Sequence, residues 1–88
     1  MSHPVKVCDD RWHGIQAGHQ FEWINDQGKT CTITKHVDNE FPFEPGPPIH
    51  VPVSGCPGMI KKTLGQGQFK YNVDCCGSRT APKNVLIP

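Results

Sequence analysis

The chain has 88 residues, 35% of them hydrophobic, and a formal net charge of +1 at pH 7. This length allows one domain with a small core, and the charge, with only Lys61 and Lys62 adjacent, does not supply the basic surface that neutralises nucleic-acid phosphates. No apolar run approaches the roughly 20 residues of a membrane span. The amino terminus lacks the charged and apolar regions of a signal peptide. We therefore expect one domain, residues 1–88, with no nucleic-acid partner and no membrane span.

The composition favours β structure. Val and Ile together number 13 and Leu only 2, and 9 Pro and 9 Gly are spread along the chain. β-branched side chains fit the pleated surface of a sheet, whereas frequent Pro and Gly interrupt helices. We predict an all-β fold, a single small antiparallel β-sandwich.

Seven short strands are expected from apolar alternation and turn residues. In chain order they are Pro4–Cys8, His19–Asn25, Lys29–Val37, Ile49–Val53, Met59–Leu64, Gln68–Asp74 and Lys83–Ile87. The stretch Asp9–Gly18 is expected to be a connection without a strand.

Two of these strands are expected to form a hairpin. Asn25-Asp26-Gln27-Gly28 has turn chemistry, because Asn and Asp bond to their own backbone and Gly adopts positive φ. The same alternation predicts an inward-facing set of side chains. Its members are Phe21, Trp23, Ile33, Phe69, Tyr71 and Val73.

A proline-rich stretch covers residues 42–58. Repeated Pro removes donors from a β-ladder, so we expect a surface crossover with Ile49–Val53 as an edge strand. A proline-rich ligand for an aromatic groove is the functional alternative.

The chain has five cysteines and no C-x-x-C pair. The odd number leaves at least one thiol unpaired within a monomer, and the usual zinc-knuckle and thioredoxin spacings are missing. Cys75 and Cys76 are adjacent, so a plain strand points them to opposite faces. A bend at Cys76-Gly77 removes that restriction.

Three segments together resemble a cupredoxin-like (plastocyanin-type) domain: FEWINDQGKTCTIT, FPFEPGPPIHVPVSG, and GQFKYNVDCCG followed by KNVLIP. In that family a strand ending in Asn and a Gly-containing turn precede the first copper histidine. A G-x-aromatic-x-aromatic strand then leads to a loop carrying Cys, His and Met, and to a final strand. The resemblance implies Greek-key connectivity of the cupredoxin type.

The ligands depart from the family pattern. Cys31 stands where the resemblance places the first histidine, and Cys75 or Cys76 stands near the ligands of the last loop. Residues 77–82, Gly-Ser-Arg-Thr-Ala-Pro, supply neither His nor Met. A blue-copper centre needs two imidazoles and one thiolate, so we do not expect one.

Cys31 and Cys75 are still expected to meet at one end of the sandwich, and three interpretations stay open. A disulfide would join the two sheets and add about 2–4 kcal/mol to a small core. Buried free thiols would act as small hydrophobic groups. A soft-metal site for copper or zinc would use Cys31, Cys75 and Cys76, with His36 as an added donor.

No group of residues meets the requirements of a nucleophile, a base and an orienting partner, so we expect no enzymatic activity. The predicted function is a non-catalytic cupredoxin-like binding module with a copper or zinc site at its cysteine-rich end. The alternative is a structural or protein-interaction sandwich that has lost the metal and uses a disulfide or buried thiols instead. Its partners would be a metal ion or another protein. The compartment is left open: cytoplasmic if Met1 is native, periplasmic or secreted if a signal peptide was removed.

Overall fold

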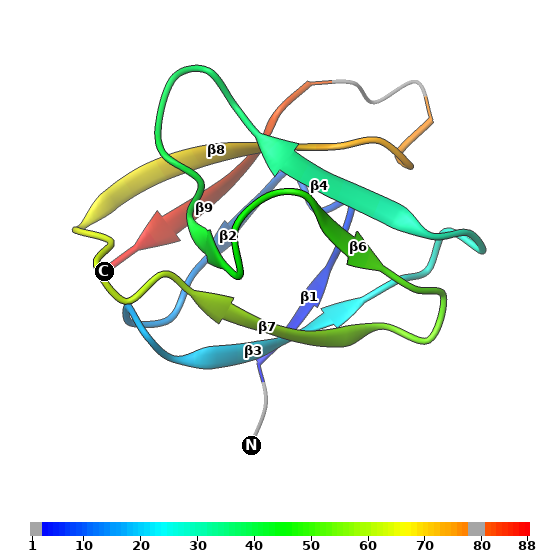
Figure 1. The fold of residues 1–88 in the computed structure, drawn as a ribbon, viewed down its shortest axis with the longest axis horizontal. Helices are drawn as coiled ribbons and strands as arrows, with labels where there is room; N and C mark the ends of the chain where they lie inside the picture. The colour runs from blue at the N-terminus through cyan, green and yellow to red at the C-terminus, as the bar shows by residue number, and fades with distance from the viewer. Residues whose placement is uncertain (1–2, 78–80) are drawn as a thin grey trace.

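A computed structural model describes residues 3–77 and 81–88 of the chain (Figure 1). It contains nine strands and no helix within those residues, which confirms the all-β fold class. The strands are β1 Pro4–Lys6, β2 Arg11–His13, β3 Gln20–Ile24, β4 Cys31–Lys35, β5 Phe43–Glu44, β6 Ile49–Val51, β7 Cys56–Ile60, β8 Gly67–Val73 and β9 Lys83–Ile87.

The strands form two packed sheets, as the sandwich prediction requires. One sheet has the order β1-β3-β7-β5 and the other the order β2-β9-β8-β4-β6. The expectation of a purely antiparallel sandwich is wrong at two pairs, because β1 runs parallel to β3 and β2 runs parallel to β9. Both parallel pairs arise at the start of the chain, where β1 lies at the edge of one sheet and β2 at the edge of the other.

The segment Asp9–Gly18 therefore contains a strand that the sequence interpretation missed. β2 has only three residues, and its Trp12 is buried while Arg11 and His13 are exposed. Three residues are too few for alternation to be read as a strand signal. Trp12 consequently packs in the core.

The expected hairpin of residues 19–37 does not form. β3 pairs with β1 and β7, whereas β4 pairs with β6 and β8 in the opposite sheet. The turn itself is present: Asn25 Oδ1 accepts a hydrogen bond from Gln27 N at 2.9 Å, and Gly28 has a φ of 75°. This turn carries the chain from one sheet to the other. The apolar alternation did not distinguish the two arrangements, because two strands can bury their apolar faces equally well as neighbours in one sheet or on opposite sides of a core.

The core is an aromatic cluster between the sheets. Phe21, Trp23 and Tyr71 are almost fully buried, as predicted, and so is Ile33. Trp23 contacts Phe21 and Phe43 edge to face, at ring-centroid distances of 4.8 and 5.1 Å, a favourable arrangement for aromatic pairs. The other two members of the predicted inward set are only partly buried: Phe69 and Val73.

The proline-rich stretch contributes more to the fold than expected. It contains β5, β6 and the first residues of β7, and Phe43 of β5 is buried in the aromatic cluster. β6 lies at the edge of the five-stranded sheet, which confirms the edge-strand prediction. β7 lies at Cys56–Ile60 instead of Met59–Leu64, and its Pro57 pairs with β3 only, since β5 reaches just Met59 and Ile60.

Candidate functional site

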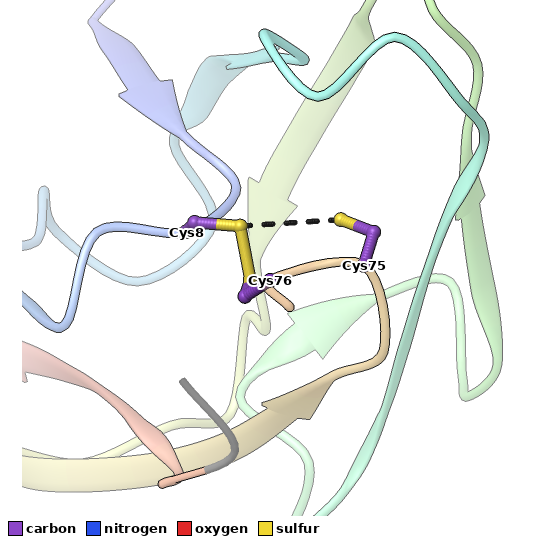
Figure 2. Close-up of side chains that lie close together, drawn as sticks. All are labelled: Cys8, Cys75 and Cys76. Carbon is purple, nitrogen blue, oxygen red and sulfur yellow. Dashed lines mark hydrogen bonds between the residues drawn. A yellow bond between two sulfur atoms is a disulfide. The ribbon is translucent and has the colours of Figure 1, made fainter. Parts of the chain in front are cut away.

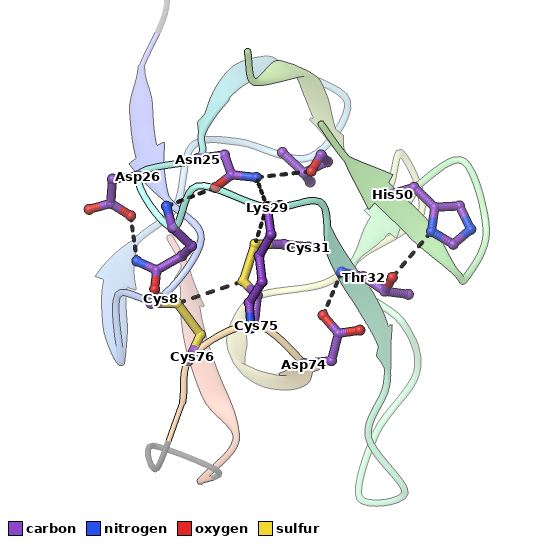
Figure 3. The surroundings of a disulfide bond; sticks show 12 residues. Cys8, Asn25, Asp26, Lys29, Cys31, Thr32, His50, Asp74, Cys75 and Cys76 are labelled. Carbon is purple, nitrogen blue, oxygen red and sulfur yellow. Dashed lines mark hydrogen bonds between the residues drawn. A yellow bond between two sulfur atoms is a disulfide. The ribbon is translucent and has the colours of Figure 1, made fainter. Parts of the chain in front are cut away.

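Four cysteines gather at one end of the sandwich, and we call Cys8, Cys31, Cys75 and Cys76 the four-cysteine cluster. They form two disulfide bridges, Cys31–Cys75 with an S–S distance of 2.03 Å and Cys8–Cys76 with one of 2.12 Å. Figure 3 shows both bridges and the side chains around them. The prediction that Cys31 and Cys75 lie within bonding reach is confirmed.

The end of β8 is fixed against β4 by the residue that precedes Cys75. Asp74 Oδ1 accepts a hydrogen bond from Thr32 N at 2.8 Å, and Asp74 N donates to Thr32 O at 3.2 Å. This double contact extends the β4–β8 ladder by one step and places Cys75 opposite Cys31, with their Cα atoms 5.2 Å apart. The bridge therefore joins neighbouring strands of one sheet, and the expectation that it would join the two sheets is wrong.

The start of β4 is held by the Asn25 side chain (Figure 3). Asn25 Nδ2 donates to Lys29 O at 2.7 Å and to Val51 O at 3.0 Å, which ties the turn to β6. Lys29 O also lies 3.6 Å from Cys31 Sγ. Cys31 thus begins β4 in a fixed position, fully buried, with a backbone acceptor beside its sulfur.

Cys8 lies in the crossover between β1 and β2. Val7 N donates to Ile24 O at 3.0 Å on one side of this crossover, and Asn84 N donates to Asp10 O at 2.8 Å on the other. Asp10 Oδ1 is also 2.9 Å from Nζ of Lys83, a lysine that is completely buried. These contacts hold the crossover against β3 on one side and β9 on the other, and bring Cys8 to the segment that follows β8.

Sequence reasoning missed Cys8 as part of the site. Its one available signal was position: Cys8 follows the alternating Val5 and Val7, and both are buried. Its bridge to Cys76 spans a sequence separation of 68 residues. Adjacency of Cys75 and Cys76 is consistent with two different partners, because neighbouring residues in extended chain point in opposite directions.

The two bridges touch each other. Sγ of Cys8 lies 4.0 Å from Sγ of Cys75, the contact drawn as a dashed line in Figure 2. The Sγ atoms of Cys8, Cys75 and Cys76 all lie within 4.8 Å of one another. A cluster of this kind can form disulfides or, with its thiols reduced, hold a metal ion.

Cys56 is the free cysteine. It lies in β7, which belongs to the four-stranded sheet, whereas Cys31 of the cluster lies in the five-stranded sheet. Partial burial raises the pKa of its thiol, and the negative charge of Glu22 raises it further. Because the thiolate is the reactive and metal-binding form, this environment makes Cys56 a poor nucleophile and a poor ligand.

The histidine predicted for the site does not join the cluster. His36 follows the opposite end of β4 from Cys31, where its Nδ1 accepts a hydrogen bond from Asp38 N at 3.1 Å. The structure therefore does not bring His36 to the three other residues predicted with it. His50 is exposed on β6, and its Nδ1 lies 3.2 Å from Thr32 Oγ1.

No protein-family model matches the chain, and a search of curated proteins found no match. Within residues 3–77 and 81–88, no helical segment has the length and hydropathy needed to cross a bilayer.

Proposed function

We propose that this chain is a non-catalytic, cupredoxin-like binding module whose four-cysteine cluster takes a soft metal ion, Cu(I) or Zn(II), when its thiols are reduced. The observation that carries the proposal is the convergence of three Sγ atoms within 4.8 Å, with a fourth, on Cys31, bonded to one of them. The resemblance adds support, since Cys31 and Cys75 stand near the ligand positions that it implies.

The spacing of the sulfurs suits a thiolate site. Zinc–sulfur bonds of about 2.3 Å in a tetrahedron put the sulfurs about 3.8 Å apart, close to the 4.0 Å between Cys8 and Cys75. A bridged sulfur is not a thiolate, so both bridges must first be reduced, for example by a dithiol. The ion then replaces the thiol protons, which makes binding weaker as the pH falls.

The test is the thermal stability of reduced protein with and without added metal. An ion that binds only the folded state raises the melting temperature by mass action. Elemental analysis gives the amount of metal bound. Cys31→Ser should lose this shift. Cys56→Ser is the matched control, because Cys56 lies outside the cluster, and it should keep the shift.

Two further readouts separate this site from other copper or zinc sites. His36→Ala should leave the metal-induced shift unchanged, because His36 bonds to Asp38 at the far end of β4. Copper(II) should give no intense blue colour, since the cluster offers no imidazole. A shift lost in His36→Ala but kept in Cys31→Ser would contradict the proposal.

A second candidate function is favoured by the bridges themselves. Under this second function, the chain is a structural or protein-interaction sandwich whose bridged cysteines serve only as cross-links. In the chain-entropy account, closing loops of 68 and 44 residues stabilises a fold by about 4 kcal/mol each. Metal-free purified protein, together with reduced protein that takes up no metal, would support this second function over the first.

A further inference from the structure

We infer that the four-cysteine cluster is a thiol–disulfide exchange site, in which a dithiol reductant opens the outer Cys8–Cys76 bridge and Cys8 then opens the inner Cys31–Cys75 bridge. The inference rests on the two bridges and their contact, and it holds whether or not the reduced cluster binds metal.

The two bridges differ in their access to solvent. Cys8 and Cys76 expose 7% and 8% of their surface, whereas Cys31 exposes none and Cys75 exposes 3%. An external thiolate must reach a bridge sulfur to attack it, so the Cys8–Cys76 bridge reacts first. The dithiol is oxidised to its own disulfide, and Cys8 and Cys76 gain the two electrons and two protons as free thiols.

The second step follows from the contact between the bridges (Figure 2). The released Cys8, as its thiolate, lies 4.0 Å from Cys75 Sγ and attacks it. A Cys8–Cys75 bond forms, the Cys31–Cys75 bond breaks, and Cys31 leaves as a thiolate. Cys31 takes up the proton that Cys8 lost, so this step transfers no net electrons.

The leaving sulfur has a hydrogen-bond acceptor in place. Lys29 O lies 3.6 Å from Cys31 Sγ, the contact drawn as a dashed line in Figure 3. Once Cys31 is released and protonated, this oxygen can accept a hydrogen bond from its S–H group. The new bridge contains Cys8, which is more exposed than Cys31. A second dithiol can therefore reach the new Cys8–Cys75 bridge.

Cys8 is a better attacking group than Cys76. A Cys75–Cys76 bond would join residues whose Cα atoms are about 3.8 Å apart across a trans peptide, below the roughly 4.4–6.8 Å of ordinary disulfides. The exchange therefore follows one route: reduction separates Cys8 from Cys76, Cys8 bonds to Cys75, and Cys31 is released.

The experiment follows reduction by dithiothreitol, in a Cys56→Ser background that removes the thiol outside the cluster. Samples are quenched with acid, unfolded, alkylated and mapped by peptide mass spectrometry, with fragmentation between Cys75 and Cys76. The expected intermediate has a Cys8–Cys75 bridge and alkyl groups on Cys31 and Cys76. The other outcome is that the species alkylated only at Cys8 and Cys76 converts directly to fully reduced protein, without this intermediate. That result would overturn the inference.

Two matched variants isolate the exchange step. Cys76→Ser and Cys8→Ser both lose the outer bridge, so both lose the same cross-link, but only Cys76→Ser keeps the Cys8 thiol. The Cys31 thiol should appear at least tenfold faster in Cys76→Ser than in Cys8→Ser. Equal rates would overturn the inference, and if either variant fails to fold, the intermediate in the unaltered cluster still decides.

Discussion

The Trp12 indole donates a 2.7 Å hydrogen bond from Nε1 to the hydroxyl oxygen of Tyr71, inside the core and across the intervening strand β9. Tyr71 is fully buried. Burial raises its pKa far above 10, the hydrogen bond from Trp12 opposes this shift, and the charge of Asp9 adds to it. The neutral phenol is therefore the form that the folded state requires.

Alkaline pH should destabilise the protein through Tyr71. Above pH 10 the unfolded chain loses the phenolic proton while the folded chain keeps it, so the free energy of unfolding falls by up to about 1.4 kcal/mol per pH unit. Urea unfolding at several pH values between about 9 and 11, in a Cys56→Ser background, should show this slope in the parent and a smaller one in Tyr71→Phe. Because the chain has one tyrosine, absorbance at 295 nm follows its ionisation directly, and a midpoint near pH 10 in folded protein would contradict the prediction.

Trp23→Ala and Phe69→Ala should differ in cost, although both residues alternate inward in sequence. Trp23 is fully buried in the aromatic cluster, and its truncation should cost about 3–5 kcal/mol. Phe69 is only partly buried, so its truncation should cost about 1–2 kcal/mol. Denaturant unfolding of both variants measures the difference, and equal losses would argue against the core described for this fold.

Gly58→Ala should destabilise the protein because β7 passes close to two aromatic rings. A Cβ atom at Gly58 would lie 2.6 Å from Phe21 Cζ and 2.7 Å from Trp23 Nε1. Overpacking of this kind costs about 1–3 kcal/mol. Gly65→Ala is the control, since a Cβ there meets no atom within 4 Å; its melting temperature should stay close to that of the parent.

Thiol counting checks the bridges. Protein unfolded without reductant should be alkylated at one cysteine, Cys56, and protein unfolded with reductant at all five. Intact-mass analysis gives both numbers in one sitting. Three alkylated cysteines without reductant would mean that one bridge is missing, and five would mean that the cluster consists of free thiols.

The sequence by itself determined the β class, the Asn25–Gly28 turn and three of the buried aromatic positions, Phe21, Trp23 and Tyr71. Each of these depends on local chemistry: strand alternation marks an inward face, and Asn and Gly permit the turn. Together with the cupredoxin resemblance, alternation also predicted that Cys31 and Cys75 lie close together. Cys31 begins β4 and Cys75 follows β8, and these two strands pair directly.

The tertiary structure alone decided which strands share a sheet and which cysteines share a bond. Alternation identifies an inward face but not a pairing partner, so β3 and β4 looked like a hairpin although they belong to different sheets. Cys8 meets Cys76 across 68 residues because the β1–β2 crossover is held against β9 by Asp10, Lys83 and Asn84. Such long-range contacts depend on how the whole chain closes around its core, and no local pattern records them.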